Sequence, residues 1–177
     1  LVIKDEEGVG DAARALVDEI QGAGIRVKLD DRTDTSFGRR ATAWELKGVP
    51  VRVEVGPRDL VNGEVTVVRR DTGEKTQVGI AGLAAHLPAM LDGMQADLLA
   101  AATVRRDART VTVSTVDEAR EAAQTGFARI PWATLGEEGE ALLARDAITV
   151  RCLQTADGDV PTSEDEPGVI AIVARAY

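Results

Sequence analysis

The clearest β-strand pattern in this chain lies in the stretch WELKGVPVRVEVGPRDL, residues 44–60. Four valines occupy alternate positions in it: Val49, Val51, Val53 and Val55. Successive side chains of a strand point to opposite faces of a sheet, so these valines predict one buried face. Arg52 and Glu54 then share the other face, where they are free to pair with each other or with a ligand.

Upstream of this strand, the sequence predicts a helix, a strand and a loop. A helical period of apolar residues runs over residues 9–23, and strict alternation over residues 25–29 predicts a half-buried strand. Residues 30–40 are polar and are expected to form a loop.

Downstream of it, two more strands are expected around the turn Asp71-Thr72-Gly73, over residues 64–70 and 75–80. A long helix follows over residues 80–106, with Pro88 as a kink or as the start of its second segment. These elements together predict a mixed α/β domain.

A second, smaller α+β unit is expected to begin near residue 109. Its strands are predicted over residues 110–114, 127–132, 148–153 and 169–174. Thr115 and Glu118 have the spacing of a capping box, which predicts a helix ending at Gly126. A weaker capping signal at Thr134 predicts a helix to about residue 146, and residues 155–168 are expected to form an acidic loop.

The charge of the chain is unevenly distributed. The 177 residues carry a net charge of −9, yet residues 26–75 hold 11 basic and 9 acidic residues, whereas residues 107–177 hold 6 and 13. A basic stretch of this kind is equally compatible with a solvated face and with contact to a nucleic acid.

Composition and end sequences restrict the class of protein. No run of about 18 apolar residues occurs, so no membrane span and no membrane partner are expected. Charged residues among the first ten replace the apolar stretch of a signal peptide, which favours a cytoplasmic location. The abrupt apolar start Leu1-Val2-Ile3 suggests a strand entered midway, and hence a piece of a longer polypeptide.

The usual enzyme signatures are missing from the sequence. It has no G-x-x-x-x-G-K-[ST], no G-x-G-x-x-G and no H-E-x-x-H motif. The single histidine, His86, is expected to have a structural or surface role, and Cys152, inside an apolar run, is expected to be a small buried residue. The neighbouring carboxylates of Asp30 and Asp31 are expected to be solvated. The sequence therefore contains no self-contained catalytic machinery.

Residues 44–60 resemble the anticodon-binding domain of prolyl-tRNA synthetase. Residues 67–75 resemble the next hairpin of that family, and the ending Ala174-Arg175-Ala176-Tyr177 resembles its archaeal and eukaryote-like branch. The resemblance covers nearly the whole chain. It implies a class IIa anticodon-binding fold, a mixed sheet flanked by helices, over residues 1–85, a helical connector over 86–108, and a small α+β C-terminal domain over 109–177.

The resemblance also implies a function and partners. The chain is expected to recognise the anticodon of tRNA(Pro) as part of an enzyme that ligates proline to its tRNA. ATP and Mg²⁺ would then act in a separate catalytic domain, which is the expected partner along with a second subunit. Without that domain, the chain is expected to be inactive and could be monomeric.

Two other functions remain open on sequence grounds. One is a stand-alone RNA- or protein-binding paralogue without aminoacylation activity. The other is a small ligand-binding protein that uses a crevice near Arg52 and Arg58.

The resemblance places base recognition on Glu45, Arg52, Arg58 and Lys75. Proline anticodons share two consecutive guanines, whose O6 and N7 accept from a guanidinium and whose N1–H and N2–H donate to a carboxylate. The alternative is that Glu45, Arg52 and Glu54 form only a cross-strand set of ion pairs.

Two parts of the chain depart from the family pattern. Where the family has aromatic residues before the Trp-Glu pair, this chain has Arg39 and Arg40, which could contact phosphate, stack on bases, or belong to a solvated turn. Many members also bind zinc through four cysteines in the C-terminal domain. Here the only cysteine is Cys152, which matches a non-ligand position, so no zinc or other metal is expected. In the family, the last residue, here Tyr177, reaches toward the catalytic domain.

Overall fold

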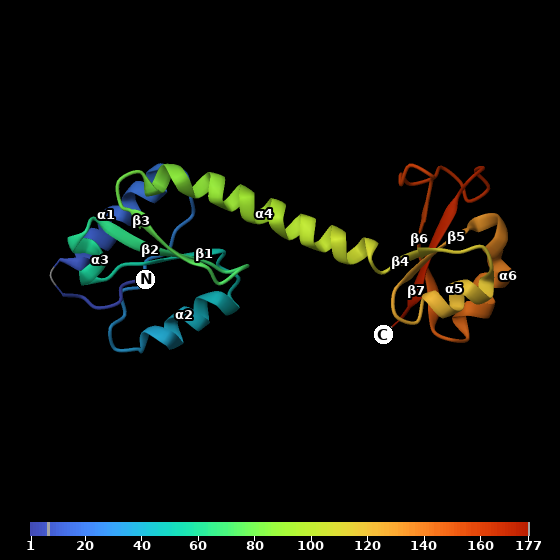
Figure 1. Ribbon diagram of the computed structural model, residues 1–177, viewed down its shortest axis with the longest axis horizontal. Helices are drawn as coiled ribbons and strands as arrows, with labels where there is room; N and C mark the ends of the chain where they lie inside the picture. Colours follow the sequence, from blue (N-terminus) through green and yellow to red (C-terminus); the bar gives the residue numbers. More distant parts are fainter. Residues whose placement is uncertain (7, 177) are drawn as a thin grey trace. The chain divides into compact units, whose positions relative to one another are not determined.

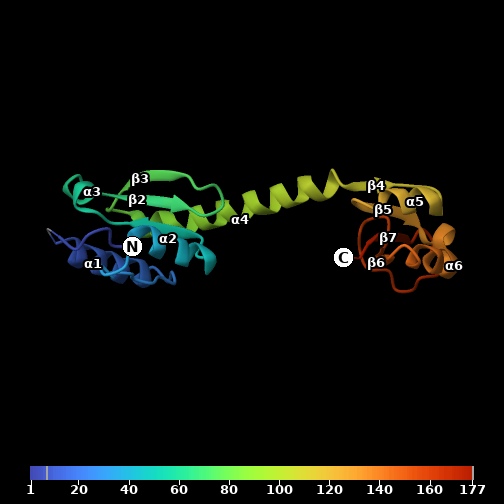
Figure 2. The ribbon, with the colours of Figure 1, turned by 90° about the horizontal axis from the view of Figure 1, so that it is seen from below.

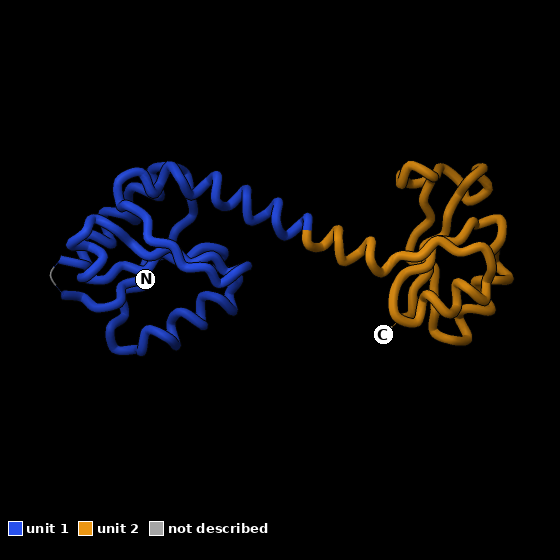
Figure 3. Tube along the Cα trace, viewed as in Figure 1, with its two compact units in different colours: residues 1–100 blue, residues 101–177 orange. Residues whose placement is uncertain are grey.

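A computed structural model describes residues 1–6 and 8–176. It divides into two compact units, residues 1–100 and 101–177 (Figure 3), and each unit has its own hydrophobic core. The expectation for Tyr177 falls outside the described residues. The division lies inside the helix α4, Leu83–Asp107, which continues through Pro88 without a break.

The first unit is built on a three-stranded antiparallel sheet in the order β1-β2-β3. Its strands are β1, Val51–Glu54, β2, Glu64–Arg69, and β3, Lys75–Gly79. The helix α1, Val9–Gly22, lies on one side of β2 and β3 (Figures 1 and 2).

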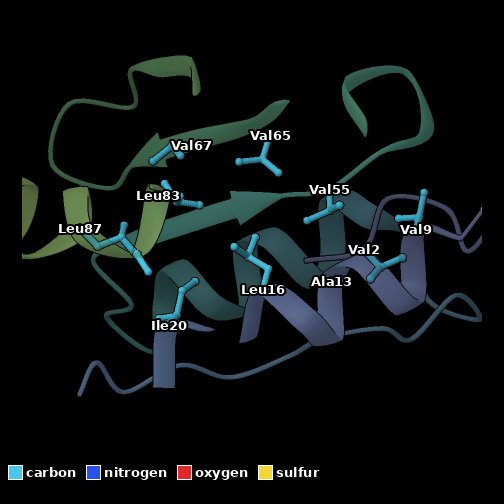
Figure 4. Packing of buried hydrophobic residues seen from close by; sticks show 11 residues of the cluster. Val2, Val9, Ala13, Leu16, Ile20, Val55, Val65, Val67, Leu83 and Leu87 are labelled. Carbon is cyan, nitrogen blue, oxygen red and sulfur yellow. The ribbon is translucent and has the colours of Figure 1, made fainter. Parts of the chain in front are cut away.

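The core of this unit forms because one stripe of α1 and one face of the sheet are apolar. Val9, Ala13, Leu16 and Ile20 recur at helical spacing and are buried. Figure 4 shows these side chains together with valines of the sheet and with Leu83 and Leu87 of α4; all belong to one cluster. Removing this apolar surface from water is the main contribution to the stability of the unit.

Two predictions for the first unit are wrong. Residues 25–29 show the predicted alternation in burial, with Ile25, Val27 and Leu29 packed against the core, but they form no strand. Residues 37–46, partly expected to be loop, form the helix α2, Phe37–Leu46. Its buried residues are Arg40 and Ala41, so the helix has no apolar stripe that the sequence could reveal.

The second unit contains a four-stranded sheet in the order β4-β5-β7-β6. Its strands are β4, Thr110–Thr112, β5, Phe127–Pro131, β6, Ile148–Gln154, and β7, Ile170–Arg175. β4 is parallel to β5, and the other pairs are antiparallel. The helices α5, Val116–Ala122, and α6, Trp132–Ala144, contact each other and lie on one side of this sheet (Figure 1). The predicted fold class, a mixed α/β unit followed by an α+β unit, is confirmed.

Local predictions in the second unit have mixed outcomes. The capping box is present, since the Thr115 hydroxyl accepts from the Glu118 amide and the Glu118 carboxylate accepts from the Thr115 amide. The helix ends at Ala122, however, and not at Gly126. The second predicted helix start, at Thr134, is displaced: α6 begins at Trp132 after Pro131, and a break at Gly136, with φ 53° and ψ −177°, separates its first turn from the rest.

Cys152 is exposed, which corrects the prediction of a buried residue. Val150 pairs with Val173, but Cys152 pairs with Ile172, so β6 has one extra residue between them. A β-bulge of this kind interrupts the alternation of side chains between the two faces.

Candidate nucleic-acid interface

The sheet of the first unit has one polar face. Residues opposite each other in antiparallel strands lie on the same face. Arg52 is opposite Val68, which is opposite Lys75, and Glu54 is opposite Thr66, which is opposite Gln77. The register therefore gathers Arg52, Glu54, Lys75 and Gln77 on the face away from the core valines.

Arg52 is the centre of this face. Its Nε donates to Oε1 of Glu54 at 2.9 Å, and its Nη1 donates to Oε1 of Glu45 at 2.5 Å. Burial alone lowers the pKa of Arg52, but the hydrogen bonds to Glu45 and Glu54 outweigh it, so the pKa is raised. The guanidinium is therefore a fixed positive charge with defined orientation.

The two carboxylates beside Arg52 differ in exposure. The side chain of Glu54 on β1 is 6% exposed, whereas that of Glu45 on α2 is 48% exposed. The second oxygen of Glu54, Oε2, lies 3.7 Å from Nζ of Lys75, whose side chain is 58% exposed. Three of the four predicted base-reading residues therefore belong to one chain of ion pairs: Arg52 pairs directly with Glu45, and Glu54 connects Arg52 to Lys75.

Arg58, the fourth predicted residue, lies on the short helix α3, Pro57–Val61, and is exposed. The next residue, Asp59, accepts hydrogen bonds from Oγ1 of Thr66 at 3.3 Å and from Nε2 of Gln77 at 3.2 Å. These contacts attach α3, and with it Arg58, to the edge of the same polar face.

Arg39 and Arg40 have different environments. Arg39 is exposed on α2, where it is available to a ligand. Arg40 is 1% exposed, and its guanidinium donates to the backbone oxygens of Val2 at 2.7 Å and Thr35 at 3.1 Å. The prediction that Arg40 contacts phosphate is therefore corrected: its donors are directed into the protein.

A structural residue that the sequence did not reveal is Asp30. It was expected to be solvated, but it is 4% exposed and accepts from Nε1 of Trp44 at 2.7 Å and from Nη2 of Arg32 at 2.7 Å. The hydrogen bond from Arg32 is the largest cause that lowers the pKa of Asp30; burial opposes it, and the bond from Trp44 lowers the pKa further. No local pattern indicates this burial, because Trp44 is fourteen residues away.

A groove of about 550 Å³ lies next to the polar face. Its lining is mainly apolar, from residues 25–29 and the valines of β1, with Glu45 and Arg52 among its polar residues. Arg58 does not line this groove. Of the two arginines expected beside a ligand-binding crevice, only Arg52 is therefore part of it.

Metal ligands do not gather in the described part of the chain, where no group of three or more His, Cys, Asp or Glu side chains is placed to hold an ion. Nor, over residues 1–6 and 8–176, is any helix long and apolar enough to cross a membrane.

Comparisons with known proteins place these observations in context. The model of the family "Anticodon binding domain" matches residues 1–90. A "Proline--tRNA ligase" of Frankia alni is 54% identical over 178 residues, which is 100% of this chain and 38% of the relative. A "Proline--tRNA ligase 2" of Streptomyces avermitilis is 58% identical with the same coverage.

A solved structure of a prolyl-tRNA synthetase is also similar to this chain. The crystal structure of prolyl-tRNA synthetase from Cryptosporidium parvum, complexed with L-proline and AMP, is similar with a TM-score of 0.77 and 28% identity. The similarity covers 99% of this chain and 40% of that one. The chain thus spans about two fifths of the length of the proteins it matches.

Proposed function

This chain belongs to the anticodon binding domain family, and we propose that it recognises the anticodon of tRNA(Pro) within a proline–tRNA ligase. The observation that carries the proposal is the set of Glu45, Arg52 and Lys75 on one polar face, with Arg58 at its edge. Single-stranded anticodon bases are recognised when they are splayed out and their edges meet such side chains.

The chemistry of this face matches two neighbouring guanines. A guanidinium donates to O6 and N7 of one guanine, and a carboxylate accepts from N1–H and N2–H of another. Arg52 and Glu45 supply this pair of groups, and in the free chain they satisfy each other at 2.5 Å. We propose that the anticodon separates them and that each then binds a guanine.

Cations around the face would supply binding that is independent of sequence. Arg39 on α2 and Arg58 on α3 are both exposed. Phosphate contacts orient a nucleic acid and depend strongly on salt, but they do not read its bases. We propose that Arg39 contributes this kind of contact, whereas Arg58 reads a base as the family resemblance implies.

The activity of the intact enzyme belongs to the same proposal. The relatives named as proline–tRNA ligases are longer than this chain, which supports an additional catalytic domain that uses ATP and Mg²⁺. We propose that the complete protein acts as a homodimer and that this chain alone ligates nothing. We also propose that the second unit is stable without zinc, since its only cysteine is Cys152.

The test is binding of the chain to a proline anticodon stem-loop at about 50 mM salt. The control is a stem-loop with both guanines changed, and Arg52→Ala is measured beside the unmodified chain. We expect a preference for the proline loop that weakens roughly five- to tenfold in the variant. Equal binding of both loops would contradict anticodon recognition and favour a paralogue with another partner.

A further inference from the structure

We propose that Glu54 is a positioning residue that fixes Arg52 and Lys75 for base recognition; the proposal rests on the anticodon function above. Glu54 contacts both side chains, through Oε1 at 2.9 Å from Nε of Arg52 and through Oε2 at 3.7 Å from Nζ of Lys75. The family resemblance did not include Glu54 among the base-reading residues, and the sequence offered it only as a member of a set of ion pairs.

The register of the sheet explains why one carboxylate can reach both cations. Arg52 and Lys75 lie on the outer strands β1 and β3, each opposite Val68 on β2. Two strand spacings separate their backbones by about 10 Å. Glu54 follows Arg52 by two residues on the same face, so its carboxylate lies between the two positive charges and reduces their mutual repulsion.

Burial makes the contact between Glu54 and Arg52 the persistent one. The side chain of Glu54 is 6% exposed and that of Arg52 is 12% exposed. Removing one partner of such a buried pair leaves an uncompensated charge, so this pair is costly to break. The Glu45 side chain is 48% exposed, and water or a base can replace it at much lower cost.

The atoms involved indicate how this arrangement serves recognition. Glu54 holds Arg52 by Nε, which is the donor on the side of the guanidinium. The two Nη atoms form the end of the fork, and a guanine that displaces Glu45 can be bound there in a bidentate manner. Glu54 thus keeps the guanidinium plane in place while its outer partner is exchanged.

The experiment compares Glu54→Gln with the unmodified chain. The measured quantity is discrimination, the ratio of dissociation constants for the control loop and the proline loop. Glu54→Gln keeps the shape of the side chain but removes the charge that holds Arg52 and Lys75. We expect discrimination to fall roughly tenfold. Glu19→Gln is the matched control, because it removes one exposed carboxylate from α1 of the same unit and is expected to leave discrimination unchanged.

A double-mutant cycle tests whether Glu54 acts through Arg52. In an Arg52→Ala background, Glu54→Gln is expected to change discrimination less than it does in the unmodified chain, because only Lys75 then remains for Glu54 to position. The positioning role would be overturned if Glu54→Gln reduced discrimination by the same factor with and without Arg52. It would also be overturned if the Glu54→Gln chain discriminated as well as the unmodified chain. A chain whose unmodified form discriminates and whose Glu54→Gln form does not would leave the anticodon function intact and support the role.

Folding is controlled separately. Each variant is compared by circular dichroism, and Glu54→Asp is a second variant for the case that Glu54→Gln does not fold. Asp keeps the charge but shortens the side chain by one methylene, which moves the carboxylate away from Nε of Arg52. We expect Glu54→Asp to lose discrimination while it binds the control loop as tightly as the unmodified chain; full discrimination would contradict the proposal. Failure of the unmodified chain to discriminate would instead refute the anticodon function itself.

Discussion

The indole Nε1 of Trp44 donates to Oδ2 of Asp30 at 2.7 Å, which connects helix α2 to the segment that precedes it. Asp30 is buried, so this contact anchors α2 to the interior of the first unit. Because Glu45 is the next residue on that helix, the bond also orients the carboxylate that faces Arg52.

Replacing Trp44 with Phe is expected to destabilise the first unit by about 2 kcal/mol, because a hydrogen bond to a buried carboxylate is lost. Phe keeps an aromatic ring under the ammonium of Lys47, which lies 4.4 Å from the Trp44 ring centroid. The loss is measured by urea unfolding followed by circular dichroism.

The control for this prediction is Trp132→Phe in the second unit, which makes the same exchange of side chains at a partly buried tryptophan away from Asp30. A loss of stability in Trp44→Phe no larger than in Trp132→Phe would show that the bond to Asp30 contributes little.

The lowered pKa of Asp30 predicts a loss of stability in acid. Its ordinary value is 3.8, and in the folded chain hydrogen bonds, first that from Arg32, lower it. The unfolded chain therefore binds a proton at higher pH than the folded chain does. The stabilisation by Asp30 is fully present above about pH 4 and is lost as the pH falls toward the folded pKa.

The measurement for this prediction is the urea midpoint of the unmodified chain and of Asp30→Asn between about pH 7 and about pH 2. Asp30→Asn is expected to be less stable at neutral pH and to approach the unmodified chain in acid. Asp31→Asn, at the exposed neighbouring residue, provides the control. A constant difference between Asp30→Asn and the unmodified chain over the whole range would contradict the prediction.

Arg40→Ala is expected to destabilise the first unit by about 3–5 kcal/mol. The change would leave the carbonyl oxygens of Val2 and Thr35 without the donor that Arg40 supplies, and would remove the buried cation beside the Asp30 carboxylate. Arg39→Ala, one residue earlier and exposed, is expected to change stability by less than about 0.5 kcal/mol. Similar melting temperatures for the two variants would mean that Arg40 is not the structural residue of this pair.

The fold could be predicted well wherever local patterns determine it. Valine alternation predicted β1, and the resemblance of residues 44–60 to prolyl-tRNA synthetase is confirmed by the relatives of that name. The errors lie where distant contacts prevail. Helix α2 is anchored by hydrogen bonds from the buried Arg40, and the exposure of Cys152 depends on a bulge. Neither feature can be recognised from hydrophobic periodicity.

The residues of the candidate site could be predicted from the sequence, but the contacts between them could not. The family resemblance identified Glu45, Arg52 and Lys75, and both these residues and the competing ion-pair set occur together in the structure. The sequence could not show that Glu54 is buried between the two cations, because that follows from the register of three strands. Their role in reading bases stays a prediction.

The capping box of the second unit gives a prediction with an internal control. Thr115→Ala is expected to destabilise this unit by about 1 kcal/mol, because the Glu118 amide loses its acceptor at the start of α5. Thr134→Ala makes the same chemical change at the second predicted cap, an exposed residue in the turn of α6 that precedes the break at Gly136, and is expected to be neutral within about 0.5 kcal/mol. Thermal unfolding of both variants measures the difference. Equal destabilisation would mean that the Thr115 hydroxyl contributes no more to stability than that of Thr134.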